Sequence, residues 1–219
     1  MSNEASRARH PGAERFIPDT DDLAEMAEAA RECRGCDLYR GATQTVFGNG
    51  AERARVLMLG EQPGDQEDRQ GEPFVGPAGA ILRRALVDAG VAERSVYLTN
   101  AVKHFRWRRD ESRGKRRIHQ RPDAGQVAAC RPWWLAEVRA VRPEILVALG
   151  ATAGQALFGS SFRVGSTRGA MLEWQEPGGR TIPVLATIHP SAVLRATDRE
   201  VAYAGFVGDM RKLAKLLKQ

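Results

Sequence analysis

The chain has 219 residues and a mass of 24.0 kDa, which suits one domain with a substantial core. Hydrophobic residues make up 42% of it, but no uninterrupted apolar stretch approaches the roughly 20 residues that span a bilayer, which excludes a membrane-spanning protein. The net charge of +6 and the pI of about 9.6 favour a polyanionic partner, either nucleic acid or an anionic surface, although many soluble proteins are merely basic.

The three cysteines and the polar N-terminus bear on the cellular compartment. Cys33, Cys36 and Cys130 are odd in number, which argues against a secreted disulfide framework. Residues 1–18 have no apolar centre and are not a secretory signal. We therefore expect a cytoplasmic protein with a flexible tail over residues 1–18 and one domain over residues 19–219.

Helical and strand patterns alternate along the chain. Helices have apolar residues three or four positions apart, and the first has Thr20 or Asp21 as its expected cap. Strands are short apolar runs, typical of parallel strands buried on both faces. Helices are expected over residues 19–33, 77–89, 123–141, 152–158 and 199–217, and strands over residues 55–59, 95–100, 145–149 and 181–188. This alternation predicts a single-domain α/β fold, with a central parallel four-stranded sheet flanked by helices on both faces.

A dense basic segment follows the second predicted strand. Nine lysines and arginines lie between Lys103 and Arg121, a density typical of phosphate-binding segments, although most basic runs are solvated loops. His119 lies near its end. A neutral imidazole beside a nucleic-acid backbone could act as a base or a nucleophile.

Polar residues follow the first, second and fourth predicted strands. They are residues 60–65, Asn100 and residues 189–191. Ligands of parallel α/β sheets bind beyond the carboxyl ends of the strands, so these residues indicate one site. Taken singly, they are a tight turn, a cap and a satisfied histidine. Neither a G-x-G-x-x-G nor a Walker lysine motif is present, which disfavours dinucleotides and nucleoside triphosphates.

From about residue 33 to its end, the chain resembles the family-four uracil-DNA glycosylases. Four motifs occur in that family's order: Gly60-Glu61-Gln62-Pro63-Gly64, Pro73-Phe74-Val75-Gly76, Thr99-Asn100-Ala101-Val102-Lys103 and His189-Pro190-Ser191. Residues 150–153 and 168–169 fit it too. The string Lys115-Arg116-Arg117-Ile118-His119 resembles the covalently linking branch of the superfamily, called UdgX.

The resemblance implies a pocket for a uracil base flipped out of DNA. Phe74 would stack on the base, and Asn100 would read its Watson–Crick edge, since an amide both donates and accepts hydrogen bonds. Gln62 and Gly60 would line the same pocket. His189 would donate to the uracil carbonyl oxygen as negative charge develops on the departing base.

The resemblance also implies how the sugar is attacked. In the covalent branch, the residue equivalent to His119 bonds to the sugar C1′, and a carboxylate such as Glu61 would orient it. In ordinary glycosylases of the family water attacks instead, and Glu61 or Asp65 would orient that water. The residues expected to contact DNA are Lys115, Arg116, Arg117, Ser191 and Arg195, the last alternatively supporting the His189 end of the site.

A cofactor is implied in the same way. Cys33-x-x-Cys36 alone could be redox-active or bind zinc. Family-four enzymes carry a 4Fe–4S cluster on four cysteines, whereas this chain has three and His104 stands where the fourth is expected. The implied ligands are Cys33, Cys36, His104 and Cys130, holding a structural cluster.

The function expected from these features is excision of uracil from DNA, followed by a covalent bond between His119 and the abasic-site sugar. Such an enzyme is consumed by its reaction. The expected substrate is uracil-containing DNA, including single-stranded DNA, bound by a monomer. Three alternatives stay open: a conventional glycosylase that turns over, a non-catalytic iron–sulfur protein that binds DNA, and a zinc protein.

Overall fold

The computed structural model describes residues 10–110 and 117–218, and a six-stranded sheet lies at its centre. In spatial order the strands are β1 (Asn49–Gly50), β3 (Val96–Asn100), β2 (Val56–Gly60), β6 (Ile145–Leu149), β8 (Thr181–Thr187) and β7 (Met171–Gln175). The four inner strands are parallel, as predicted, while β1 and β7 add an antiparallel strand at each edge.

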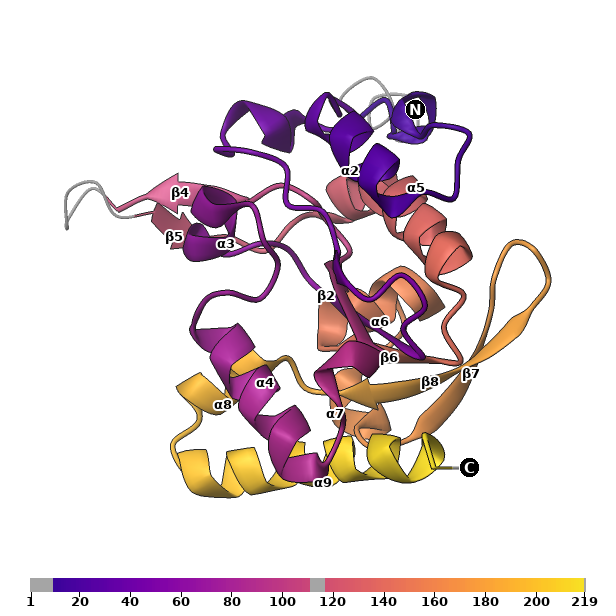
Figure 1. The fold of residues 1–219 in the computed structure, drawn as a ribbon. Coiled ribbons are helices and arrows are strands. Elements are labelled where there is room, and N and C mark those ends of the chain that lie inside the picture. The colour runs from indigo at the N-terminus through magenta and orange to yellow at the C-terminus, as the bar shows by residue number, and fades with distance from the viewer. Residues whose placement is uncertain (1–9, 111–116, 219) are drawn as a thin grey trace.

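Helices cover both faces of this sheet (Figure 1). One face carries α4 (Pro77–Ala89), α8 (Pro190–Arg195) and α9 (Arg199–Leu216), and the other carries α5 (Ala124–Val141) and α6 (Ala151–Phe158). The remaining helices are α2 (Leu23–Arg31), α3 (Asp65–Gln70) and α7 (Val164–Thr167), with 3-10 turns at Glu14–Phe16, Asp37–Arg40 and Glu93–Ser95. Within residues 10–110 and 117–218, no helix combines the length and apolarity needed to cross a membrane.

Strand β2 shows why the central strands are apolar throughout. All five of its residues are buried. Val56 and Met58 pack into the core under α4 and α9, whereas Leu57 and Leu59 pack under α5 and α6. Successive side chains of a strand point to opposite faces, so a sheet covered on both sides requires apolar residues at every position.

The predicted helices agree closely with the observed ones, and the caps explain their ends. Helix α4 begins at Pro77 and ends before Gly90, whose φ of 74° suits glycine. A capping box between Asp123 and Gln126 starts α5. The first helix corrects the expected cap: Asp22, rather than Thr20 or Asp21, accepts hydrogen bonds from the next turn.

The described parts of the basic segment include an antiparallel ribbon. Strands β4 (Trp107–Arg109) and β5 (Arg117–His119) pair so that Trp107 lies opposite His119. The ribbon projects from the body beside α3 (Figure 1). Lys115 and Arg116, both expected to contact DNA, lie outside the described residues, so their roles stay predictions.

The expected flexible tail is corrected for the part that the structure describes. Ala13 is fully buried, and its N–H donates to the Ala129 carbonyl at 2.9 Å. The Gly12 N–H donates to the Gly35 carbonyl, also at 2.9 Å. The segment from His10 onward therefore packs on α5 and on the turn that carries Cys36, while residues 1–9 lie outside the described chain.

Candidate active site

A cavity of about 1040 Å³ lies at the carboxyl ends of the parallel strands. Its lining brings together ten of the residues singled out in the sequence: Glu61, Gln62, Asp65, Phe74, Asn100, Arg117, His119, His189, Ser191 and Arg195. Glu61 and Gln62 follow β2, Asn100 ends β3, and His189 follows β8. The others belong to α3, the loop before α4, the ribbon and α8. The predicted convergence of the strand-end residues is therefore observed.

Asn100 ends β3 and presents an unsatisfied acceptor. Its side chain is buried, and its Oδ1 has no hydrogen-bond partner among the described residues. Buried polar atoms normally have a partner, so an unsatisfied acceptor in a cavity wall is suited to a ligand donor. Gly60 makes this placement possible, because a Cβ there would overlap both Asn100 Oδ1 and the Phe74 ring.

Phe74 has a backbone conformation unusual for a bulky residue. Its φ is 58°, in the left-handed region, and its ring is buried. Such strain is retained where a side chain must point in a particular direction, and active sites are a common place for it. The ring lies 6.2 Å from that of His189 with an interplanar angle of 29°, so the two rings form one wall of the cavity.

The contacts of His189 define its tautomer. Its Nδ1 accepts the backbone N–H of Ser191 at 3.2 Å and lies 2.7 Å from the Ser191 hydroxyl, which also accepts from Arg195 Nη1 at 3.0 Å. Because Nδ1 is an acceptor, the proton is on Nε2. Burial, assisted by Arg195 and His119, lowers the pKa of His189 to about 4. The ring is therefore a neutral donor at physiological pH.

His119 lies beside the side chains that follow β2. Its Nε2 is 2.9 Å from Gln62 Nε2 and 3.6 Å from Glu61 Oε1. Burial lowers the pKa of His119, and the nearby Glu61 carboxylate offsets part of that shift. A neutral imidazole retains a lone pair for attack on an electrophile.

Two residues missed in the sequence hold Glu61. The Thr152 hydroxyl donates to Glu61 Oε2, and Arg121 Nε donates to the Thr152 hydroxyl at 3.1 Å. Arg121 Nε also lies 4.0 Å from Glu61 Oε2. Thr152 belongs to the motif over residues 150–153, and Arg121 ends the basic segment. Both therefore lie in patterns noted in the sequence, but neither was given a role there.

Gln62 lines the cavity, as expected. Its side-chain amide also has partners that the sequence did not show. Oε1 accepts the Arg106 N–H at 3.0 Å, and Nε2 donates to the carbonyl oxygens of Arg106 at 3.1 Å and Gln120 at 2.9 Å. The amide therefore connects the end of β2 to the residues on either side of the ribbon.

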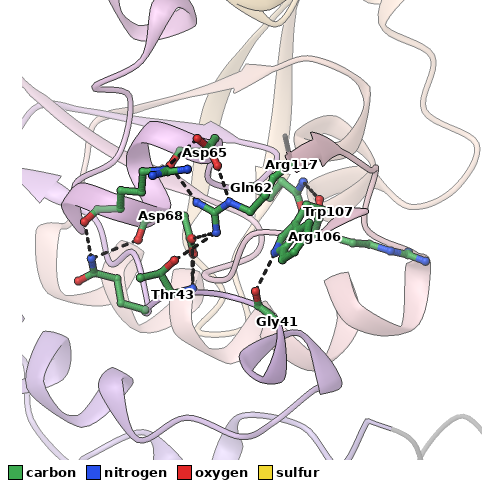
Figure 2. Close-up of polar contacts among 10 residues, drawn as sticks. Gly41, Thr43, Gln62, Asp65, Asp68, Arg106, Trp107 and Arg117 are labelled. Carbon is green, nitrogen blue, oxygen red and sulfur yellow. Dashed lines mark hydrogen bonds and ion pairs between the residues drawn. The ribbon is translucent and has the colours of Figure 1, made fainter. Parts of the chain in front are cut away.

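Asp65 and Arg117 form an ion pair (Figure 2). Asp65 Oδ1 lies 2.5 Å from Arg117 Nε, and Asp65 Oδ2 lies 3.0 Å from Arg69 Nε. The Arg117 side chain is only 11% exposed. In the absence of DNA its guanidinium faces carboxylates, and the expected phosphate contact of Arg117 stays a prediction. The Asp65 carboxylate is likewise paired with arginines, and its expected role in orienting a water stays a prediction.

A second group of predicted residues packs around Cys130 of α5. Cys33, Cys36 and Cys130 are buried free thiols. Each sulfur accepts an N–H hydrogen bond: Cys33 from Trp133 Nε1 at 3.1 Å, Cys130 from the Lys103 backbone at 3.3 Å, and Cys36 from the Leu38 backbone. Burial raises the pKa of Cys36 to about 11, so metal binding here would release protons.

His104 is buried and follows Lys103, whose backbone N–H contacts Cys130 Sγ. Its Nε2 is 2.9 Å from Thr45 Oγ1, whose proton goes to the Ala30 carbonyl at 2.9 Å. Nε2 must therefore be the donor, which leaves the lone pair on Nδ1. Burial lowers the pKa of His104 to about 4, so the ring is neutral. Among the described residues, no three His, Cys, Asp or Glu side chains form a group that could hold a metal ion.

Comparisons with known proteins agree with this geometry. Residues 47–211 match the Uracil DNA glycosylase superfamily. The chain is 34% identical over 183 residues to the type-4 uracil-DNA glycosylase of Thermotoga maritima, covering 83% of this chain and 88% of that protein. It is 32% identical over 200 residues to the type-4 enzyme of Archaeoglobus fulgidus, covering 90% and 94%. It is 32% identical over 161 residues to the type-5 enzyme of Pyrobaculum aerophilum, covering 67% and 65%.

Proposed function

Since this chain belongs to the uracil-DNA glycosylase superfamily, we propose that it excises uracil from DNA and then bonds the abasic sugar to His119. The excision is the activity named for its relatives. The observation that carries it here is the buried, unpartnered Asn100 Oδ1 in the cavity wall. Capture is supported by the position of His119, 3.6 Å from Glu61.

Recognition of the base follows from the donors and acceptors of the pocket. Asn100 Oδ1 accepts the N3–H of uracil, a proton that cytosine lacks at that nitrogen. Asn100 Nδ2 donates to the neighbouring carbonyl oxygen, and Phe74 stacks on the ring. A pocket built to hydrogen-bond a substrate N–H strongly rejects an analogue without it.

Bond cleavage separates charge between the base and the sugar. The C1′–N1 bond breaks and its electron pair leaves with uracil, whose carbonyl oxygens share the negative charge. His189 Nε2–H donates to one of these oxygens, and a neutral donor in a buried site stabilises that anion. The sugar left behind carries positive charge, which the Glu61 carboxylate in the cavity lining stabilises.

In the proposed second step, the abasic sugar becomes bonded to the protein. One nitrogen of His119 donates its lone pair to C1′, forming an N–C bond and an imidazolium that keeps its proton on the other nitrogen. Glu61 stabilises this cation, and the uracil anion takes a proton from solvent. No second step frees the enzyme, so each molecule acts once.

The conventional type-4 reaction is the second candidate, and the names of the relatives favour it. Water then attacks C1′, Glu61 takes a proton from it, and the enzyme turns over. In that reaction, His119 would only line the cavity and would not bond to the sugar.

We propose further that Cys33, Cys36, His104 and Cys130 hold a 4Fe–4S cluster. The N–H donors to all three sulfurs suit thiolate ligands, and the His104 tautomer suits a metal. The cluster would supply a structural crosslink between the N-terminal segment and α5. Absorbance near 400 nm and an iron assay test this ligand set, and zinc without iron contradicts it.

The experiment for the main proposal uses a labelled single-stranded oligonucleotide that contains one uracil. Released uracil is measured, and a denaturing gel measures heat-stable protein–DNA adduct. Adduct in the wild-type chain and its loss in His119→Ala support capture. Uracil release with turnover and no adduct selects the conventional enzyme. DNA binding without release selects the non-catalytic alternative. Strand preference, monomeric state and cytoplasmic location stay predictions.

A further inference from the structure

Arg117 and His119 occupy alternate positions of strand β5. Alternate side chains of a strand point to the same face, so whatever fixes Arg117 also fixes the direction of His119. The described part of the ribbon has three residue pairs, and a two-stranded ribbon is at best marginally stable alone. Its position must therefore be set by contacts to the body of the protein.

The Arg117 guanidinium supplies those contacts (Figure 2). Its Nε is 2.5 Å from Asp65 Oδ1, its Nη1 is 2.6 Å from Asp68 Oδ2, and its Nη1 donates to the Thr43 hydroxyl at 3.1 Å. Asp65 and Asp68 lie on α3, which starts four residues after Glu61. Arg117 thus connects the ribbon to the element that follows β2 and to the segment around Thr43.

The surroundings of Arg117 are those of an anchored group. Its guanidinium carbon lies 5.4 Å from the ring centres of both Phe105 and Trp107. Asp68 is fully buried and also accepts the Thr43 N–H. Trp107 Nε1 donates to the Gly41 carbonyl at 2.7 Å. A planar, forked guanidinium suits this paired and stacked site in a way that a lysine ammonium does not.

We propose that Arg117 is a positioning residue that decides whether this protein captures DNA or releases it. The inference rests on the proposed capture by His119. Groups that expel uracil, namely Asn100, Phe74 and His189, belong to β3, the loop before α4 and the start of α8, not to the ribbon. Without the anchor, the base still leaves, but His119 no longer meets C1′. Water then bonds to C1′, its proton passes to Glu61, and the enzyme is free.

The test compares the ratio of adduct to released uracil in four chains with the same oligonucleotide. In wild-type protein we expect about one adduct per uracil. Arg117→Ala should lower the adduct fraction at least tenfold while releasing more than one uracil per enzyme. Arg117→Lys keeps the charge but loses the fork, and should resemble Arg117→Ala. Arg108→Ala removes an exposed arginine of the same ribbon and should match wild type.

The outcomes distinguish capture by His119 from positioning by Arg117. No adduct in wild-type protein overturns capture itself, and the role of Arg117 falls with it. Adduct in wild type with an unchanged ratio in Arg117→Ala overturns positioning alone. Equal losses of adduct and release in Arg117→Ala, both restored in Arg117→Lys, identify a phosphate contact and also overturn it. If Arg117→Ala releases no uracil, Asp68→Asn decides: it must lower the ratio while uracil release continues, and an unchanged ratio overturns the proposal.

Discussion

At the scale of single residues, the geometry of the site depends on a glycine as much as on the residues proposed to react. Asn100 Oδ1 can remain unsatisfied in the cavity wall only because position 60 has no side chain. The same absence makes room for Phe74. Gly60 therefore makes room for two groups that we propose to contact the base.

Gly60→Ala should lower the single-turnover rate of uracil release by about 10²-fold, because a displacement of about 1 Å at a catalytic group has that effect. Gly208→Ala is the matched control, since a Cβ in this glycine of α9 meets nothing within 4 Å. Its rate should equal that of wild type. A Gly60→Ala rate within twofold of wild type would contradict this account.

Capture should depend on pH through His119. Only the neutral imidazole has a lone pair, and burial lowers the pKa of His119 from its usual value of 6.5. The rate of adduct formation should therefore be constant between pH 8 and pH 7 and should fall only below pH 6.5. Uracil release is the internal control, since His189, with a pKa of about 4, stays neutral over that range. A midpoint above 6.5 for capture would show that His119 is not in the environment described.

At the scale of elements, periodic segments could be predicted and the ribbon could not. Helices α4 and α5 have regular apolar spacing and clear caps, so their bounds followed from local sequence. Strands β4 and β5 have three residues each, largely charged, and pair because Gln62 and Arg117 connect them to distant segments. The ion pair of Arg117 with Asp65 could not be predicted for the same reason: charge is visible in a sequence, but a partner 52 residues away is not.

Helix α8 provides a prediction at this scale. Its first turn holds the His189 tautomer through the backbone and hydroxyl of Ser191. Ser191→Ala keeps the backbone donor and removes the hydroxyl, a loss of about 1 kcal/mol for a neutral hydrogen bond. The rate of uracil release should fall roughly five- to tenfold, whereas the adduct fraction among released products should not change. A changed fraction would indicate that α8 also positions His119.

At the scale of the whole molecule, one buried ion pair connects the two sites. Lys103 Nζ lies 2.5 Å from Glu137 Oε2, and both side chains are fully buried. The same ammonium group donates to the Asn100 carbonyl at 3.2 Å, and the Lys103 backbone N–H donates to Cys130 Sγ. Because this pair joins β3 to α5, it supports both the base pocket and the cysteine group.

Lys103→Met should lower the free energy of unfolding by about 3–5 kcal/mol, since it leaves the Glu137 carboxylate buried without its counter-charge. The double variant Lys103→Met with Glu137→Met removes both charges and should recover part of that loss. Urea denaturation measures both values. A single variant as stable as wild type would show that Glu137 is satisfied by its other donors, Thr99, Tyr97 and Gly48.

The anchoring of the ribbon has a consequence for how the proposed DNA capture could be transferred between relatives. The strand of His119 also carries Arg117, which pairs with Asp68 on α3, and His119 itself contacts Gln62 after β2. A histidine grafted alone into the matching loop of a glycosylase that turns over would arrive without these partners. Inheritance of capture would therefore require several distant positions to change together, and a transplant of the ribbon would need to carry the carboxylates that receive it.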